Sequence, residues 1–309
     1  MSGTDGLQNC EECLEPADAF AIVGQESRLA ILEALWRLDE PAAFSEIRAE
    51  VGMADSAQFN YHLGKLTDQF VRKTDQGYEL RTAGERIVQA ILAGSFTQHP
   101  ERAVDIDDPC VRCGATLTAH YADEQLSIEC PDCGHGHGEY PFPPGGLHDR
   151  TDAEILRAFD QRVRHLHCLA KDGVCPECNG RMATAIERGE TCCLGVAVRA
   201  THRCRQCALE LCAAVGLGLL DQSPVVSFYA DHGVDLAEAP YWRRQWCVDD
   251  HPVTVDDDDP WRLRVEMTAG GERLVVTVDG DLDIVDSERR PVSESGDEAP
   301  VGGSVTVGE

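Results

Sequence analysis

The chain has 309 residues, of which 42% are hydrophobic, and this is enough apolar material for two or three domains with their own cores. The formal net charge of −28 argues against nonspecific affinity for nucleic acid, so any DNA contact must come from a local patch. The longest apolar run, residues 211–220, is about half a membrane span, and the N-terminus lacks the features of a signal peptide, so we expect a cytoplasmic protein.

Residues 19–96, which follow a polar tail over 1–18, carry the pattern of a small helical domain. Apolar residues recur at helical spacing over 27–38, and a second, short helix is expected over 45–51. Asp55 is the expected N-cap of a third helix, which we predict to carry polar side chains on its exposed face.

A β-hairpin and a fourth helix are predicted to complete this region. Two short β-prone segments flank Gly77 within residues 71–80, and Thr82 and Glu85 have the spacing of a capping box that begins a helix. A short helix, a tight turn and a polar-faced helix, followed by a hairpin, predict a winged helix-turn-helix.

At residues 26–32 (ESRLAIL) and 56–66 (SAQFNYHLGKL), the sequence resembles the ArsR-like winged-helix regulators. The resemblance implies a homodimer whose third helix enters the major groove of double-stranded DNA while the wing contacts the backbone. By position, it implies a DNA-binding set of Gln58, Asn60, Tyr61, His62, Lys65, Arg72 and Lys73, with the first three nearest the bases. Residues 44–51 lack the cysteine motif of the metal-sensing members, so metal sensing of that kind is not expected.

Two segments depart from the negative charge of the chain. Residues 56–82 hold four basic side chains against three acidic ones, and residues 175–207 hold five against three. Because phosphate contacts set both affinity and salt dependence, so small an excess predicts modest DNA binding with a weak dependence on salt. The alternatives are a winged helix used only for protein contacts and arginines that merely solvate a hairpin.

Four Cys-x-x-Cys pairs follow the helical region. Two thiolates separated by two residues can bind one Zn²⁺, and two such pairs complete a tetrahedral shell, so the spacing predicts zinc ribbons over 109–140 and 172–212. In a reducing compartment, paired cysteines bind metal more often than they form disulfides. The eight expected ligands are Cys110, Cys113, Cys130, Cys133, Cys175, Cys178, Cys204 and Cys207.

Both zinc ions are expected to be structural, because four sulfur ligands leave no open position for a substrate. The first ribbon is predicted to pair strands over 115–121 and 126–129, and the second to pair 182–188 with 196–202. Two further cysteine pairs are left open. Cys10 and Cys13 could complete a site with Cys192 and Cys193 or across a dimer, although free thiols are favoured.

The remaining segments are assigned from periodicity and composition. We expect a linker over 97–108, a helix over 150–170 that bridges the ribbons, an α+β region over 213–287 and a disordered acidic tail over 288–309. Helices are expected over 209–220 and 224–232, and strands over 261–267, 274–278 and 282–285. Aromatic residues between 228 and 261 could line an effector pocket, but a small core is the favoured interpretation.

The predicted fold class is therefore α+β: a winged helix-turn-helix, two zinc ribbons and a small α+β C-terminal region. This order resembles a set of regulators of halophilic archaea. The composition agrees with that resemblance, because only three lysines accompany the many acidic residues, as is typical of proteins that work in molar salt.

We expect a sequence-specific DNA-binding transcriptional regulator, dimeric and without enzymatic activity. No Walker loop, nucleophile elbow or His-Glu-x-x-His motif is present, and the pattern of a zinc deaminase is incomplete at residues 174–178. The alternative is a general transcription initiation factor similar to the archaeal TFE-alpha type, which contacts RNA polymerase. A second ribbon and a polar third helix count against that alternative.

Overall fold

The computed structural model describes residues 14–189 and 195–292. These residues form a mixed α+β protein with several separate sheets, as the sequence predicts. They divide into two compact units, one made of residues 14–99 with 143–145 and the other of the remaining described residues. No helix in the described ranges has the length and apolar character needed to cross a membrane.

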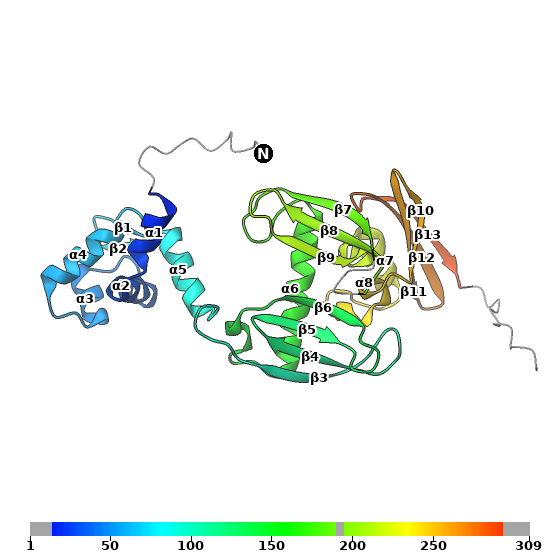
Figure 1. Cartoon of the computed structure of the whole chain (residues 1–309), viewed down its shortest axis with the longest axis horizontal. Helices are drawn as coiled ribbons and strands as arrows, with labels where there is room; N and C mark the ends of the chain where they lie inside the picture. Colours follow the sequence, from blue (N-terminus) through cyan, green and yellow to red (C-terminus); the bar gives the residue numbers. More distant parts are fainter. Residues whose placement is uncertain (1–13, 190–194, 293–309) are drawn as a thin grey trace, which may run out of the picture. The chain divides into compact units, whose positions relative to one another are not determined.

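The first unit contains five helices and a hairpin within the described residues (Figure 1). Its elements are α1 (Pro16–Val23), α2 (Glu26–Arg37), α3 (Phe44–Val51), α4 (Ser56–Leu66), β1 (Val71–Lys73), β2 (Tyr78–Leu80) and α5 (Thr82–Leu92). They pack around an apolar cluster in which Ile31, Leu35 and Phe59 are completely buried. Helix α1 begins inside the segment expected to be a polar tail.

Local sequence explains where the helices of this unit begin and end. Gly52 takes a left-handed conformation (φ 71°) and ends α3. The carboxylate of Asp55 accepts hydrogen bonds from the backbone N–H groups of Ala57 (2.7 Å) and Gln58 (3.1 Å), which confirms it as the N-cap of α4. The capping box predicted at Thr82 is wrong, because Thr82 is already helical and Arg81 precedes it without a side-chain cap.

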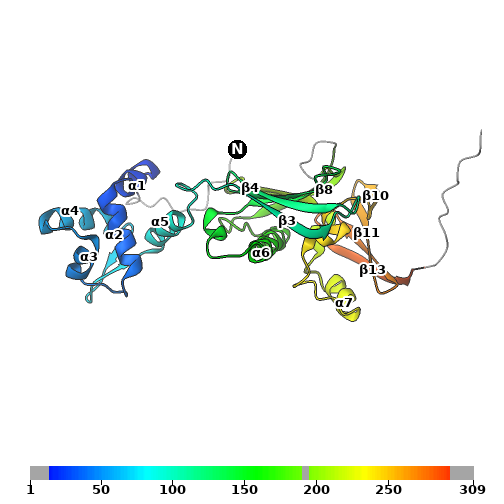
Figure 2. The ribbon, with the colours of Figure 1, turned by 90° about the horizontal axis from the view of Figure 1, so that it is seen from below.

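The second unit is built on two antiparallel sheets and one long helix. The first sheet has the order β3 (Arg102–Pro109), β4 (Thr116–Ala122), β5 (Gln125–Glu129), β6 (Gly136–Pro141), and the second β7 (Met182–Arg188), β8 (Val198–Cys204), β9 (Glu210–Ala214). Helix α6 (Asp152–Lys171) runs from one sheet to the other in Figure 1 and covers one side of both in Figure 2. Thr151 and Glu154 form its capping box.

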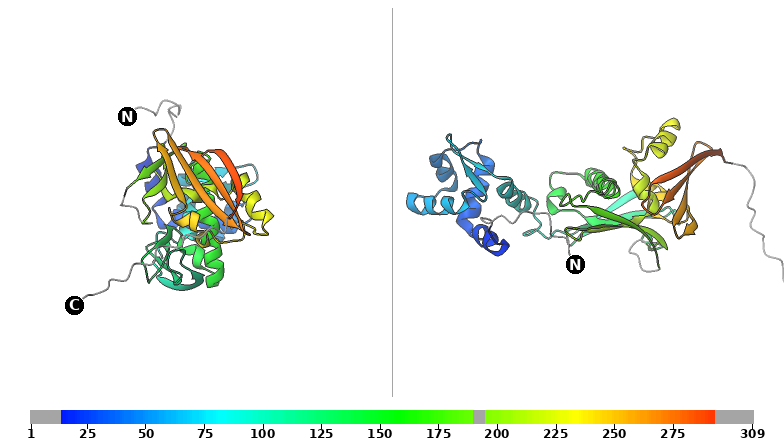
Figure 3. Two further views of the ribbon diagram at one scale, coloured as in Figure 1. Left: turned by 90° about the vertical axis from the view of Figure 1, so that its right-hand side faces the viewer. Right: turned by 90° about the horizontal axis from the view of Figure 1, so that it is seen from above.

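A third antiparallel sheet completes this unit, and its strands are seen face-on in the left panel of Figure 3. Its strands are β10 (Val253–Asp258), β11 (Trp261–Ala269), β12 (Glu272–Asp279) and β13 (Ile284–Pro291), and the helices before it are α7 (Ser223–Asp231) and α8 (Gln245–Val248). A single apolar cluster takes side chains from all three sheets and from α6. The two ribbons and the C-terminal region therefore share one core.

The structure also differs from the sequence-based expectations in several other segments. Residues 209–220 are predicted to be a helix but form β9 followed by a 3-10 turn over Val215–Leu219. The prediction is wrong because a continuous apolar run has no periodicity that distinguishes a helix from a buried strand. The range 97–108, expected as a linker, contains most of β3. Strand β10 was not expected, and β13 extends to Pro291, into the predicted acidic tail, whose residues 293–309 lie outside the described ranges.

Candidate functional site

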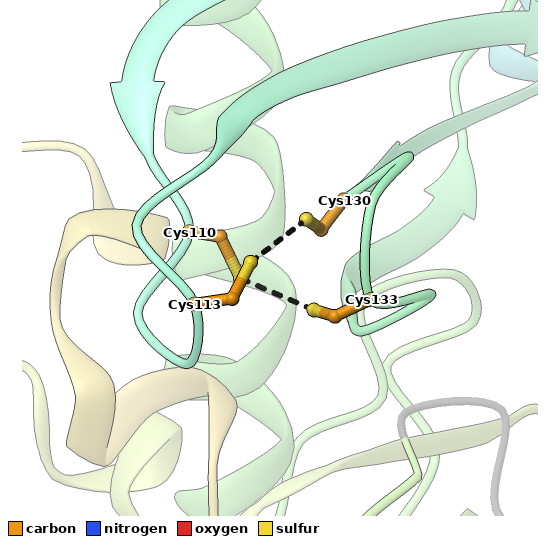
Figure 4. Close-up of side chains that lie close together, drawn as sticks. All are labelled: Cys110, Cys113, Cys130 and Cys133. Carbon is orange, nitrogen blue, oxygen red and sulfur yellow. Dashed lines mark hydrogen bonds between the residues drawn. The ribbon is translucent and has the colours of Figure 1, made fainter.

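The structure brings the four cysteines of the first ribbon together, as their spacing predicts. Cys110 and Cys113 lie on the loop between β3 and β4, and Cys130 and Cys133 on the loop between β5 and β6 (Figure 4). Their Sγ atoms all lie within 4.8 Å of one another. The Cys110–Cys133 and Cys113–Cys130 sulfur separations are 3.7 and 3.4 Å. This group of thiols is compatible with a metal ion at its centre.

The second ribbon repeats the arrangement with different elements. Cys175 and Cys178 lie before β7, and Cys204 and Cys207 at the end of β8. The sulfur separations are 3.7 Å for Cys175–Cys207 and 3.5 Å for Cys178–Cys204. In both clusters the first cysteine of each pair is buried and the second is exposed. One side of each candidate site is therefore held by the core while the other faces solvent.

The four cysteine pairs of the two clusters share one backbone conformation. The N–H of the first cysteine donates to the carbonyl five residues later, at 2.7 Å for Cys110, 3.0 Å for Cys130 and 2.8 Å for both Cys175 and Cys204. The residue after the second cysteine has a positive φ in every pair: Gly114, Gly134, Asn179 and Ala208. This left-handed residue reverses the chain, so each short segment presents two thiols in one direction.

Backbone amides lower the pKa values of the cluster cysteines, whereas a neighbouring thiol lowers the pKa of one cysteine and raises that of another. At Cys204, hydrogen bonds from the N–H groups of Cys207 and Gln206 stabilise the thiolate, outweigh burial and lower its pKa to about 6. At Cys178 the amide of Gly180 also favours the thiolate, but the adjacent thiols outweigh it and raise the pKa to about 12. Four negative sulfurs at this spacing need a cation between them, so the donor set fits a divalent metal ion.

Arg112, inside the first cysteine pair, joins that loop to the segment after α8. Its Nη2 and Nε donate to the two carboxylate oxygens of Asp249 at 2.8 and 3.2 Å, and the Asp249 side chain is completely buried. The next residue, Asp250, accepts from the backbone N–H groups of Ala197 (2.6 Å) and Val198 (3.2 Å) at the start of β8. Through these hydrogen bonds, two consecutive aspartates connect both ribbons to the segment that follows α8.

Asp249, Asp250 and His251 are also close enough to share a cation. The Nδ1 of His251 lies 2.9 Å from both Asp249 oxygens, which already accept from Arg112. Both carboxylate oxygens of Asp249 therefore already accept hydrogen bonds from protein groups. We interpret these three residues as a structural contact between the ribbons and the C-terminal segment. Sequence reasoning missed it because Arg112 and Asp249 are 137 positions apart and no local pattern relates them.

The predicted DNA-contact residues of α4 divide into two groups. The first group is exposed and consists of Gln58, Asn60, Tyr61 and Lys65, with the Lys65 ammonium 5.7 Å from the centre of the Tyr61 ring. His62 is only 8% exposed and lies on the core side of the helix, so the prediction that it shares the polar face is corrected. Its spacing of three residues from the buried Phe59 accounts for this orientation.

The two predicted phosphate contacts of the hairpin are both exposed. The Nε of Arg72 donates to Glu79 of the opposite strand at 2.7 Å, so part of its charge is already neutralised. The Lys73 ammonium lies 5.8 Å from the centre of the Tyr78 ring. Of the two cations, Lys73 is therefore the one whose charge is not neutralised by an acidic side chain of the hairpin.

The remaining cysteines and aromatic residues are chiefly structural. Cys10, Cys13, Cys192 and Cys193 lie outside the described residues. Burial raises the pKa of Cys168 on α6 to about 12, which disfavours a reactive thiolate there. Most of the aromatic residues between 228 and 261 are buried in the core, as the favoured interpretation expected, but Tyr229 and Trp246 also border a cavity.

Comparisons with known proteins separate the same two regions of the chain. Residues 16–91 match the family described as Domain of unknown function (DUF7347). The chain matches no curated protein and no solved structure. Residues 107–284, more than half of the chain, match the family described as Domain of unknown function (DUF7351), and the chain therefore belongs to that family.

Proposed function

We propose that this protein is a sequence-specific DNA-binding transcriptional regulator of the ArsR-like winged-helix type with two structural zinc ions. The observation that carries the proposal is the polar face of α4. This helix follows α3 across a turn of four residues, precedes the β1–β2 hairpin, and exposes Gln58, Asn60, Tyr61 and Lys65. The order and the exposed donors suit a helix that enters the major groove beside a wing.

Chemical fit supports Asn60 and Gln58 as base contacts and Lys65 and Lys73 as phosphate contacts. Side-chain amides can donate to and accept from adenine in a bidentate manner, and lysines supply point charges for phosphate. The near-neutral charge of residues 56–82 gives this surface an advantage over the rest of an acidic chain in approaching DNA.

Zinc is the proposed metal because the donors are four sulfurs in each cluster. A Zn–S bond of about 2.3 Å places the sulfurs of a regular tetrahedron about 3.8 Å apart. Two sulfur pairs in each cluster are 3.4 to 3.7 Å apart, which is close to that value. With four protein ligands the ions would stabilise the fold and take no part in a reaction.

A homodimer is part of the proposal. Phe20 on α1 and Phe96 after α5 are 70% and 73% exposed, and Leu92 at the end of α5 is 56% exposed. Large apolar side chains left in solvent suit burial against a second copy of the same unit.

A variant pair tests the assignment of α4. In Asn60→Ala with Lys65→Ala, an amide and a cation are removed from the proposed DNA surface, so we expect the affinity for a selected operator to fall at least tenfold. The matched control is Gln89→Ala with Arg86→Ala, which removes the same two groups from the exposed side of α5. Operators would be obtained by selection from random duplexes and affinities measured by fluorescence anisotropy. Equal affinity of both variants would contradict the proposal.

Genome-wide crosslinking of the tagged protein separates the regulator from the general initiation factor. A limited set of peaks that share a motif supports a specific regulator. Signal at most active promoters, in proportion to polymerase, would instead support the general factor.

A further inference from the structure

A cavity of about 360 Å³ lies in the second unit where the segment around α8 meets the third sheet. This volume is in the range of small-molecule sites. Side chains from α7, from the segment around α8 and from β11 and β12 form its walls. The charged and polar members on which the chemistry of the cavity depends are Arg243, Arg244, His251, Glu266, Thr268 and Arg273.

The charge of this cavity is opposite to that of the chain. Three arginines line it against a single carboxylate, Glu266, in a protein of net charge −28. A neighbouring cavity of about 260 Å³ has the reverse balance, with four carboxylates against two arginines. The positive potential is therefore a local feature of these walls, and concave walls of one sign concentrate ligands of the opposite sign.

Two of the three arginines have carboxylate partners, and the third does not. Arg243 donates to Asp108 at 2.6 Å and Arg273 to Glu266 at 2.9 Å. Within the described ranges, the guanidinium of Arg244 has no hydrogen bond or ion pair, and its Nε is buried without an acceptor. A buried N–H that lacks an acceptor is costly. The other two guanidinium nitrogens of Arg244 also have no protein acceptor among the described residues, so they are the groups that can donate to an oxyanion in the cavity.

Packing fixes the unpartnered Arg244 in place. Its guanidinium lies 5.2 Å from the centre of the Tyr229 ring, which stacks on Trp246 with ring centres 5.9 Å apart. The indole N–H of Trp246 donates to the Tyr229 hydroxyl at 2.7 Å. Gly216 packs so closely against the Trp246 carbonyl that no side chain fits between them. The cation thus rests on a rigid aromatic platform, as in a preorganised site.

Other polar side chains of the walls have defined surroundings. Arg273 on β12 is directly opposite Thr268 on β11, so both side chains are on the same face of the sheet. His251 donates through Nδ1 to the buried Asp249, which fixes the ring at the edge of the cavity and leaves Nε2 as a hydrogen-bond acceptor. Guanidinium and hydroxyl groups around one cavity form a donor set that matches the oxygens of an anion.

We infer that this cavity binds a small organic anion through a phosphate or carboxylate group, with Arg244 as the principal donor and Arg273 as the second. The planar guanidinium of Arg244 can present two parallel N–H groups to such an oxyanion. The inference concerns the second unit alone and does not require that the first unit binds DNA.

Calorimetric titration of the full zinc-loaded chain tests the inference, with pyrophosphate and citrate as probes at constant ionic strength in KCl. We expect saturable binding of one anion per chain by at least one probe. Arg244→Gln should weaken it at least tenfold, because the bidentate donor is lost. The matched control is Arg157→Gln, which removes an exposed arginine that pairs with Glu238 outside this cavity, and it should bind within about twofold of the wild type.

Zinc content and circular dichroism would verify that Arg244→Gln is folded. If it is not, Arg273→Gln, which removes the second donor, takes its place with the same expected direction. The inference is overturned if neither probe gives saturable heat or if the folded variant binds as tightly as the wild type. It is also overturned if a short DNA duplex displaces the probe, because the cavity would then belong to a nucleic-acid surface.

Discussion

Asp249 is the residue on which the connections of the second unit converge. Its carboxylate has no exposed surface and accepts from Arg112, His251 and the backbone of Asp250. Burial would raise the pKa of Asp249, but the donors from Arg112 and His251 outweigh it and hold the pKa far below its ordinary value. The carboxylate therefore stays ionised, and Arg112 keeps its partner, over the whole neutral and mildly acidic range.

Asp249→Asn tests how much this contact stabilises the fold. Asparagine keeps the shape but removes the charge and leaves Arg112 facing a neutral group, so we expect a loss on the order of 3 kcal/mol in the free energy of unfolding. Denaturant titration of the zinc-loaded protein measures this loss. The wild type should keep the stabilisation above the ordinary pKa of an aspartate and lose it as the pH falls further.

Asp256→Asn is the control for this prediction. Asp256 also makes a bidentate contact with an arginine, Arg264, but both side chains are partly exposed on the third sheet. Water and salt screen such a pair, so its loss should be a small fraction of the loss at Asp249. Similar effects of the two substitutions would mean that burial does not set the strength of the Arg112 contact.

At the scale of single residues, metal-binding cysteines are easier to predict from the sequence than the tertiary contacts of a side chain. The eight cysteines are recognisable because two thiolates on one metal require a short fixed spacing. His62 could have been assigned correctly, since it falls three residues after Phe59 on the buried stripe of α4. The role of Arg244 cannot be predicted from the sequence. Its guanidinium lacks a protein acceptor only because of the way in which α7, α8 and the third sheet pack together.

At the scale of elements, the two cysteine clusters are independent sites on separate sheets. Cys204→Ser should remove zinc from the second cluster only, because the first is formed by other strands. We expect zinc content to fall from two ions to one per chain and amide hydrogen exchange to increase over β7–β9. Metal binding in such sites contributes roughly 10 kcal/mol or more to folding.

Cys168→Ser is the control for the zinc prediction. Cys168 is a thiol of α6 that belongs to neither cluster. This variant should retain two zinc ions and the exchange pattern of the wild type. If Cys204→Ser also retained two ions, Cys204 would not be a required ligand of the second site.

Some elements are predictable from sequence for clear physical reasons, and others are not. The hairpin of β4 and β5 follows from two β-prone segments around a short polar turn, and Asp123 and Glu124 adopt positive φ there without glycine. The α7 helix was expected over 224–232 and is found at Ser223–Asp231. The sequence predicts a helix where strand β9 lies, because residues 211–220 are apolar throughout and show no alternation.

At the scale of the whole molecule, the net charge of −28 predicts a strong effect of salt on stability. Self-repulsion destabilises a compact acidic chain, and at about 1 M salt the screening length falls to about 3 Å. We therefore expect the melting temperature to rise as KCl increases from about 0.1 to 2 M. Salt also weakens exposed ion pairs such as Arg157–Glu238, but each of these contributes little.

Differential scanning calorimetry on the zinc-loaded chain would measure this dependence. Sucrose at matched viscosity serves as a control for effects unrelated to charge. A melting temperature that stays constant or falls with KCl would contradict the expected role of self-repulsion.

The shared core of the second unit restricts which segments of the gene can be exchanged by recombination. Side chains of both ribbons, α6 and the third sheet enter one apolar cluster, whereas residues 16–91 contribute to another. The two family matches have the same boundary, because one covers residues 16–91 and the other covers residues 107–284. Recombination could therefore exchange the N-terminal segment between genes without loss of either core. A single ribbon cannot be inherited alone, since its apolar face would arrive without the partners that cover it.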